Sequence, residues 1–244
     1  MTYYQCNMSQ ESAEMAAIFT GVQPDVILHC AGSANVGASV VNPMADLDGN
    51  LHSLYQLLLA LKSFEKRPEI IFLSSAGVYG NPRQLPVRES DVAAPMSPYG
   101  LHKHMGEELC EYYNRIHGYH IRSIRIFSAY GNGLRKQLLW DIYQKYQNTG
   151  RIELFGTGEE TRDFIHVSDI MRAIDLILSY DGPEAVINVA NGEEVSIREL
   201  AEIYAEKLGA PQNIVSFNGA VKEGDPRNWR ADISVLRIRS GGYE

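Results

Sequence analysis

Two stretches decide the fold of this chain: Ile-Ile-Phe-Leu-Ser-Ser at residues 70–75 and Ser-Pro-Tyr-Gly-Leu-His-Lys at residues 97–103. The first predicts a buried strand, and the second predicts a helix that opens at Ser97. On a helix, a four-residue spacing puts Tyr99 and Lys103 on one face, a turn apart. An ammonium beside a phenol lowers the pKa of the phenol, which can then exchange a proton with a hydroxyl or carbonyl.

A serine at the end of the strand completes the candidate site. Ser75 can hydrogen-bond the same substrate oxygen, so Ser75, Tyr99 and Lys103 together predict a proton-transfer site for alcohol–ketone chemistry. A lone Tyr-x-x-x-Lys is common on exposed helices and is weak evidence by itself. Its position after an apolar strand strengthens it, because α/β sheets place their sites at the carboxyl ends of parallel strands. His102 and His104, which flank Lys103, are expected on the surface.

Composition limits the function classes. A chain of 244 residues predicts one large domain, or a domain with a small lobe. The formal charge of −8 gives no basic footprint for nucleic acid, and no apolar run or leader pattern predicts a membrane span or a signal peptide. Cys6, Cys30 and Cys110 show no metal-ligand spacing, so we predict no metal site and a reducing, cytoplasmic setting.

Apolar strands and helical patterns alternate along the chain. Strands are expected at 1–7 (the end of one), 25–30, 70–73, 121–127, 152–155, 185–189 and 214–217, and helices at 9–20, 43–64, from 97 on, and at 134–147, 168–179 and 196–208. This alternation predicts an α/β fold with a doubly wound parallel sheet. We expect residues 1–130 to form a partial Rossmann-like domain, with parts of 160–190 packing back on it, and residues 131–244 to form a smaller lobe.

The helix expected over 43–64 carries leucines at helical spacing, and these predict its core face: Leu47, Leu51, Leu54, Leu58 and Leu61. Asn50 lies well inside this helix. Most such polar residues face solvent, but this one could reach a site at the edge of the sheet.

Several motifs in order resemble the extended short-chain dehydrogenase/reductase family, in its branch of nucleotide-sugar epimerases and dehydratases. No single motif is specific, but together they cover nearly the whole chain; they lie at residues 24–32, 73–80, 97–103, 125–131, 156–169, 224–226 and 231–232. The resemblance implies that NAD, with NADP as an alternative, oxidises a sugar hydroxyl of a nucleotide sugar. It makes Tyr99 the base, Lys103 its partner on the nicotinamide ribose, and Ser75 a donor to the sugar oxygen.

The resemblance also implies two sets of binding residues. The cofactor set is Asn7, Met8, Cys30, Ala31, Gly32, Asn50, Ser74, Tyr99, Lys103 and Phe127. The substrate set is Ser75, Ser128, Arg135, Phe155, Arg162 and Lys222. Arg162 matches an arginine that grips the substrate's diphosphate, which suits a bidentate cation; its alternative reading is a surface ion pair with Asp163 or Asp169.

The loop after Ser75 narrows the reaction. Dehydratases of the family carry an acidic pair where this chain has Ala76 and Gly77, so dehydration is disfavoured. We expect epimerisation at C4 of a UDP-hexose through a keto intermediate. The alternatives are reduction of a 4-keto nucleotide sugar and, from another class, a non-catalytic nucleotide-sugar-binding or dimerisation module.

The chain departs from the family at its start. No Gly-x-x-Gly-x-x-Gly precedes the strand near Pro24, and about fifty residues look absent, judged by two βα units. Either this is a fragment of a full enzyme, or a shortened protein that no longer binds NAD normally. The resemblance also implies a homodimer through the helices near 43–64 and 98–117.

Overall fold

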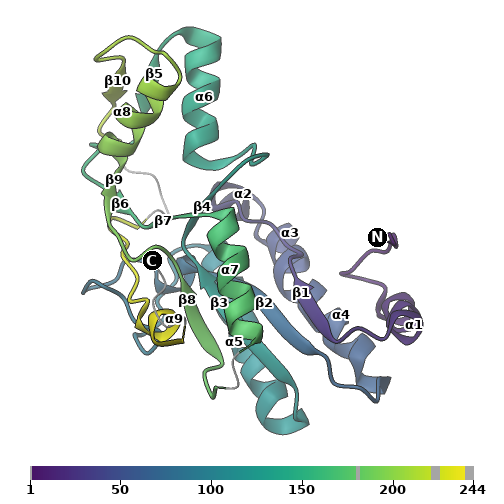
Figure 1. Cartoon of the computed structure of the whole chain (residues 1–244). Coiled ribbons are helices and arrows are strands. Elements are labelled where there is room, and N and C mark those ends of the chain that lie inside the picture. The colour runs from purple at the N-terminus through teal and green to yellow at the C-terminus, as the bar shows by residue number, and fades with distance from the viewer. Residues whose placement is uncertain (1, 180–181, 221–225, 240–244) are drawn as a thin grey trace.

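Four parallel strands form the central sheet, in the order β1, β2, β3, β8 (Figure 1). The computed structural model describes residues 2–179, 182–220 and 226–239. The strands are Val26–His29, Glu69–Ser75, His120–Ile126 and Val186–Val189. The predicted α/β fold with a parallel sheet is confirmed.

Helices cover both faces of this sheet, because successive side chains of a strand point to opposite faces. On β2, Ile70 and Phe72 pack with the leucines of α4, whereas Ile71 packs with α7. The helices of the first face are α1 (Ser12–Val22), α4 (Ser53–Ala60) and α5 (Pro98–His117). Those of the second are α7 (Val167–Leu178) and α9 (Ser234–Arg239).

Helix α5 begins where its sequence predicts. The Ser97 hydroxyl accepts a hydrogen bond from the Gly100 amide at 3.1 Å, and Pro98 occupies the first turn, where its missing N–H costs nothing. Gly118 ends the helix in a left-handed conformation at φ 63°. Tyr99 and Lys103 therefore sit in the first two turns of a well-defined helix, beside the end of β2.

The helix expected over 43–64 contains a π-helical turn. Its parts are α3 (Pro43–Leu47), the π turn Asp48–His52, α4 and a 3-10 turn at Leu61–Ser63. Such a turn changes which residues face inward, and it often marks a functional site. As a result Asn50 is fully buried, and the buried leucines are Leu54, Leu57, Leu58 and Leu61, not Leu47 and Leu51.

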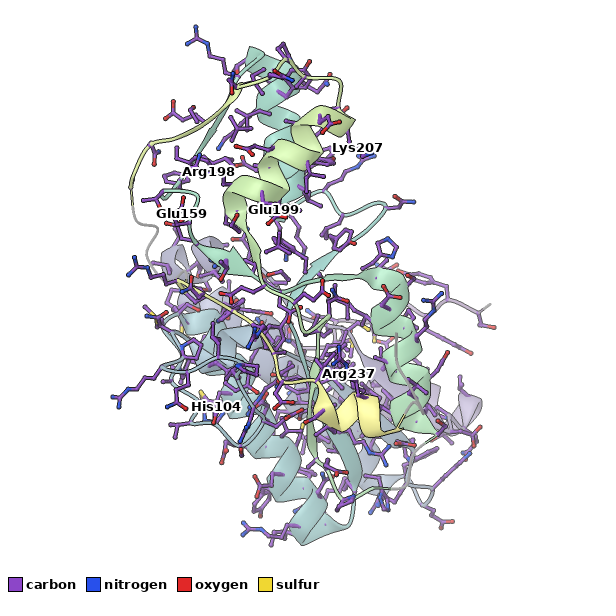
Figure 2. All side chains as sticks on the ribbon, turned by 60° about the vertical axis from the view of Figure 1, so that its left-hand side comes forward. His104, Glu159, Arg198, Glu199, Lys207 and Arg237 are labelled. Carbon is purple, nitrogen blue, oxygen red and sulfur yellow. The ribbon has the colours of Figure 1, made fainter. Side chains whose placement is uncertain are left out.

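The elements at residues 137–162 and 195–217 lie toward one end of the molecule, at the top of Figure 1. Strand β4 (Ser128–Tyr130) pairs with β7 (Phe164–His166) in parallel, β5 (Ile152–Leu154) with β10 (Val215–Phe217) in parallel, and β6 (Thr161–Arg162) with β9 (Val195–Ser196) antiparallel. A separate apolar cluster joins β5 to α6 (Gln137–Thr149) and α8 (Ile197–Lys207). The Ser196 hydroxyl caps α8 at the Glu199 amide, as predicted, and Arg198 of its first turn pairs with Glu159 (Figure 2).

Some local predictions are wrong. Residues 2–7 form no strand, and the first helix begins at Ser12. Helix α2 (Val36–Val41) was not predicted; the Asn35 side chain caps it. Helix α6 begins at Gln137, so Arg135 and Lys136 precede it instead of forming its first turn. Helix α7 begins at Val167, one residue before its predicted start, and the His166 side chain caps it.

Strand β1 is less buried than its apolar sequence predicts. Within the described residues its only sheet neighbour is β2, and the side chains of Val26 and Leu28 are 40% and 38% exposed. An apolar run cannot by itself distinguish a central strand from an outer one. Within the same described ranges, no helix combines the length and apolar character needed to cross a bilayer.

Candidate active site at the end of strand β2

Tyr99 and Ser75 lie together where β2 runs into the first turn of α5. The Ser75 hydroxyl and the Tyr99 ring both lie against Gly77, and the Ser75 hydroxyl accepts a hydrogen bond from the Gly77 amide at 3.1 Å. The Tyr99 amide donates to the Ser39 hydroxyl of α2 at 3.1 Å, which fixes the start of α5. Burial raises the pKa of Tyr99, Ser75 lowers it in part, and Asp46 adds a smaller increase.

Lys103 is buried one turn further along α5. Its ammonium donates to the Leu73 carbonyl at 2.8 Å and lies 4.9 Å from the centre of the Phe72 ring. Burial lowers the pKa of Lys103 to about 8, and the negative charge of Asp46 acts against this. The Lys103 ammonium donates to the Leu73 carbonyl and burial dominates the pKa of Tyr99, so the acidification of Tyr99 by Lys103 stays a prediction.

Three buried polar atoms without partners lie on β1 and on the segment from α3 into the π-helical turn. Asn50 Oδ1, His29 Nδ1 and Asp46 Oδ1 are buried and lack a hydrogen-bond partner among the described residues. Such atoms are rare in protein interiors and need an explanation, for example a bound ligand or water. Burial and the Lys103 charge lower the pKa of His29 to about 4. This group therefore marks the site as a place for a polar ligand.

The loop after β1 approaches Asn50 closely at Gly32. The Asn50 amide nitrogen donates to the carbonyls of Ser33 and Asp46 at 3.3 and 3.2 Å. Gly32 has φ 121°, and a Cβ added there would lie 2.2 Å from Asn50 Oδ1. Only glycine fits this position, and it leaves the backbone open to a ligand.

The other residues predicted to line the cofactor lie in different surroundings. Cys30 is exposed as a residue, but partial burial of its thiol raises the pKa of that thiol. The charge of Lys103 acts in the opposite direction and lowers it. The Ser74 hydroxyl donates to the Glu107 carboxylate at 2.5 Å. Phe127 is buried between Tyr79 and Trp229. Asn7 and Met8 lie before α1, where the Asn7 side chain accepts the Ser9 amide and hydroxyl.

Arg162 lies against a tryptophan that the sequence reading missed. Its guanidinium is 5.4 Å from the centre of the Trp229 ring and donates to the Thr161 carbonyl at 2.7 Å. Ser128 is near this group, since β4 pairs with β7 just after β6 and the Ser128 amide donates to the Asp163 carbonyl. The indole nitrogen of Trp229 donates to the Gly80 carbonyl at 3.0 Å, so it ties this group to the loop after Ser75.

The remaining predicted substrate residues are not joined to this group by any described contact. Arg135 is exposed, 6.0 Å from the centre of the Trp140 ring, and Phe155 is exposed beside Lys145. Lys222 lies outside the described residues.

His102 is not a surface residue, contrary to the sequence-based expectation. Its ring is buried between α5 and α3, and its Nδ1 lies 2.7 Å from Asp46 Oδ2. Helix α3 covers this face of α5, which the sequence of α5 alone could not indicate. His104 is half-buried, with its Nδ1 3.6 Å from Glu107 Oε2 (Figure 2).

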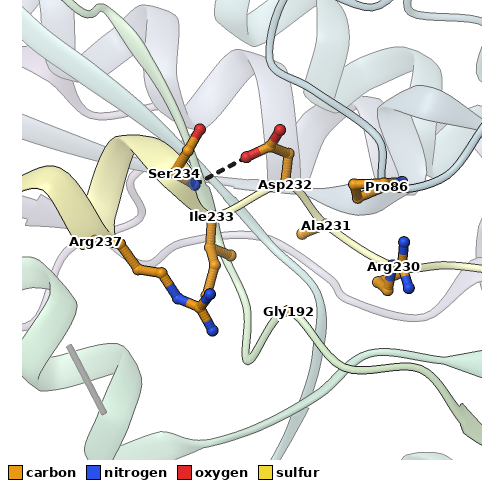
Figure 3. A pocket seen from close by; sticks show the side chains of 8 residues that line it. All are labelled: Pro86, Gly192, Arg230, Ala231, Asp232, Ile233, Ser234 and Arg237. Carbon is orange, nitrogen blue, oxygen red and sulfur yellow. Dashed lines mark hydrogen bonds between the residues drawn. The ribbon is translucent and has the colours of Figure 1, made fainter. Parts of the chain in front are cut away.

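A pocket of about 250 Å³ lies elsewhere, beside the start of α9 (Figure 3). Arg230 and Arg237 line it, and the Ser234 amide donates to Asp232 at 2.9 Å. It shares no residue with Ser75, Tyr99 or Lys103, so this pocket is separate from the candidate active site.

Comparison with known proteins is consistent with this geometry. The model of the NAD dependent epimerase/dehydratase family matches residues 2–190. This chain belongs to that family. A putative UDP-glucose 4-epimerase of Methanocaldococcus jannaschii is 35% identical over 229 residues, which are 90% of this chain and 72% of that protein.

Two solved structures of this family have the same fold. The UDP-glucose 4-epimerase of Thermotoga maritima with UDP-glucose is 25% identical, with a TM-score of 0.88, and the match covers 98% of this chain and 78% of that one. The UDP-glucuronic acid 4-epimerase of Bacillus cereus with UDP-glucuronic acid and NAD is 26% identical, with a TM-score of 0.85, over 94% of this chain and 73% of that one.

The residues around Lys103 fit the nicotinamide half of NAD. A ribose hydroxyl can both donate and accept hydrogen bonds, so it suits an ammonium beside an unpaired amide oxygen. Lys103 supplies the ammonium, Asn50 Oδ1 supplies the acceptor, and Gly32 leaves its backbone accessible.

Proposed function

We propose that this chain epimerises a nucleotide-diphosphate sugar with NAD, at C4 of a UDP-hexose, through a transient keto intermediate. The observation that carries the proposal is the buried Tyr99 phenol with the Ser75 hydroxyl beside it and Lys103 on the same helix. Membership of the NAD dependent epimerase/dehydratase family and the names of the relatives above support it.

The proton chemistry belongs to Tyr99. When bound, NAD accepts a hydride from the sugar carbon and later returns it. The Tyr99 oxygen takes the proton of the sugar hydroxyl in the oxidation and gives it back to the same oxygen in the reduction. The Ser75 hydroxyl orients that oxygen. A phenolate at neutral pH needs positive charge nearby, which we assign to the Lys103 ammonium, largely charged below a pH of about 8.

Residues of the second half of the chain hold the rest of the substrate in this proposal. Arg162, backed by the Trp229 ring, binds the diphosphate through its planar guanidinium. Ser128, Arg135 and Phe155 contact other parts of the substrate, and Lys222 adds a point charge for the phosphates. Residues 131–244 then make up the substrate lobe, except for the parts of 160–190 and helix α9, which pack on the central sheet.

A turnover experiment tests this function. The purified chain with NAD and UDP-glucose, without added NADH, is expected to form UDP-galactose, detected by chromatography. The Tyr99→Phe variant is the control and is expected to form none. Oxidation of NADPH by a 4-keto nucleotide sugar, without interconversion of the two hexoses, would instead identify a reductase. Failure to bind either NAD or a UDP-sugar in calorimetry would favour the non-catalytic module.

Exposed apolar side chains suggest how the chain assembles. On α5, Leu101, Met105, Tyr112 and Ile116 recur at helical spacing and are all exposed. Tyr55 of α4 is exposed too and close enough to affect Tyr113 of α5. We infer that this surface, the α4–α5 stripe, pairs with a second copy in a homodimer. The three free cysteines favour a reducing compartment, and we assign the protein to the cytoplasm.

A further inference from the structure

Two titratable side chains that the mechanism above does not use are buried against each other, where α3 packs on the first turns of α5. They are Asp46 of α3 and His102 of α5, whose side chains are 3% and 9% exposed. A carboxylate only accepts hydrogen bonds, so His102 Nδ1 donates to Asp46 Oδ2, 2.7 Å away. Burying such a pair costs free energy that an apolar pair would not, so a specific role is worth seeking.

Asp46 also reaches the candidate cofactor side of the site. Its backbone carbonyl accepts a hydrogen bond from the Asn50 amide at 3.2 Å, across one turn of the π-helical segment. Its second carboxylate oxygen, Oδ1, is buried and has no hydrogen-bond partner within the described residues. Asp46 therefore contacts one site residue through its backbone and keeps an oxygen available inside the protein.

His102 holds this carboxylate from within the catalytic helix. It follows Tyr99 by three residues and directly precedes Lys103 on α5. A carboxylate that is hydrogen-bonded on one oxygen is fixed in orientation, which directs Oδ1 away from the histidine. The hydrogen bond from His102 thus fixes the Asp46 carboxylate relative to Tyr99 and Lys103, which come before and after His102 on α5.

The charge of Asp46 acts on both members of the centre. It is the strongest influence that favours the charged form of Lys103 against burial, and it also makes ionisation of Tyr99 harder. The other groups that act electrostatically with Lys103 come from β1, its end and α5: His29, Cys30, Glu107 and Cys110. Of these, Glu107 uses both carboxylate oxygens on the Arg125 cation, whereas Asp46 keeps Oδ1 without a partner among the described residues, so we assign the counter-charge of the ammonium to Asp46.

We propose that Asp46, oriented by His102, is a positioning residue of the Tyr99–Lys103 centre that keeps the Lys103 ammonium charged. This rests on the proposed function only in calling that centre catalytic. Without the Asp46 charge, Lys103 loses its proton nearer to neutral pH, and the site loses the cation that supports the phenolate.

The test is the titration of Lys103 itself. Protein labelled with ¹³C-lysine is titrated by NMR, and Lys103→Arg identifies the Lys103 Cε signal. Asp46→Asn keeps the shape and a hydrogen-bonding group but removes the charge. We expect the midpoint of Lys103 to fall by about one pH unit, as for the loss of a nearby opposite charge. An unchanged midpoint in folded Asp46→Asn protein would overturn the proposal.

Asp48 provides a matched control two residues away. It also pairs with a histidine, His52, at 2.7 Å, but both of these side chains are more than half exposed. We expect Asp48→Asn to leave the Lys103 midpoint unchanged, because water screens that charge. An equal shift in both variants would mean that any acidic residue of this segment has the effect, and would contradict a specific role for Asp46.

Variants of His102 keep the proposal testable if Asp46→Asn does not fold. Asparagine can place its amide nitrogen where Nδ1 lies, so His102→Asn is expected to keep the wild-type midpoint of Lys103. His102→Leu removes the donor and is expected to lower the midpoint. Equal midpoints in both variants would overturn the orienting role of His102.

This experiment separates the inference from the proposed function, because the titration needs no turnover. If UDP-hexoses are interconverted, the alkaline limb of the pH–rate profile is expected to move down in Asp46→Asn with the Lys103 midpoint. Turnover with unchanged titration would overturn only the role of Asp46. A shifted titration in a chain that epimerises nothing would contradict only the proposed function.

Discussion

The Glu107 carboxylate of α5 holds the Arg125 guanidinium of β3 through two hydrogen bonds, at 2.9 Å to Nε and 2.8 Å to Nη2. Both side chains are buried, 4% and 6% exposed, and the Ser74 hydroxyl donates to the same carboxylate. The pair ties the helix that carries Tyr99 and Lys103 to the neighbouring strand. It therefore sets where the phenol lies relative to the sheet.

Removing one charge of the Glu107–Arg125 pair is expected to destabilise the protein strongly. Glu107→Gln leaves the Arg125 charge buried without a counter-charge, so we expect the free energy of unfolding to fall by about 3–5 kcal/mol. Urea denaturation followed by circular dichroism measures it. As a control, Arg172→Ala removes the exposed Arg172–Asp169 pair and is expected to change stability by about 1 kcal/mol or less. Equal losses in the two variants would contradict a special role for Glu107.

Tyr99→Phe is expected to abolish most activity while keeping the fold. The ring still packs, but the proton-transferring hydroxyl is gone, so kcat is expected to fall by about 10²–10⁴-fold. Turnover of the UDP-hexose and the melting temperature are measured together. Tyr3→Phe, at an exposed position before α1, should leave both unchanged. Retained activity in Tyr99→Phe would remove Tyr99 from the mechanism.

Because its pKa is lowered, the buried His29 is expected to reduce the free energy of unfolding in acid. Its pKa is lowered to about 4 in the folded chain against 6.5 for the free side chain, so the unfolded chain binds the extra proton between these values. Stability is therefore full above pH 6.5 and falls as the pH drops toward 4, by about 3 kcal/mol.

Comparison with His29→Gln isolates this contribution, because all other titrating groups are shared. Between pH 6.5 and 4 the variant is expected to lose about 3 kcal/mol less than the wild type in urea unfolding. Replacing the exposed His120 by Gln provides the control, which should follow the wild type. Parallel curves for wild type and His29→Gln would show that His29 titrates normally.

Arg162→Lys tests the proposed diphosphate site. Lysine keeps the charge but loses the planar pair of donors and the stacking on Trp229, so we expect UDP to bind about 10–100-fold more weakly. Calorimetry with UDP measures this without any need for turnover. Arg172→Lys on the exposed face of α7 is the control. Unchanged affinity in Arg162→Lys would move the diphosphate elsewhere.

The α4–α5 stripe predicts a dimer that a single charge can split. Met105→Glu places a carboxylate in the middle of the exposed apolar row of α5, and a buried unpaired charge opposes association. Light scattering is expected to give twice the chain mass for the wild type and the chain mass for the variant. Val92→Glu changes an even more exposed apolar side chain, 86% against 42%, in a loop and should remain dimeric. A monomeric wild type would exclude this assembly.

The sequence predicted the framework of the site because its signals are local. The strand before Ser75, the Ser97 cap and the four-residue spacing of Tyr99 and Lys103 depend on short-range rules, and the structure has all three. The sequence leaves open whether Asn50 faces solvent or reaches the site, because a helical pattern does not reveal a π-helical turn.

The contacts that the sequence did not reveal are between distant elements. Asp46 and His102 are 56 positions apart, and Trp229 contacts Phe127 and Arg162 from near the end of the chain. Neither pairing has a periodic signal. Local rules also place Lys103 near Tyr99 but cannot tell that the Leu73 carbonyl engages its ammonium.

The buried carboxylate of Asp163 accepts hydrogen bonds from three backbone amides. These belong to Asn191 and Gly192 after β8, and to Ala231 before α9. Burial raises the pKa of Asp163 to about 6. In mildly acidic solution its protonation would weaken all three attachments together. The C-terminal segment, which carries Trp229 to the Arg162 side of the site, should then exchange its amide hydrogens for deuterium sooner than the sheet does.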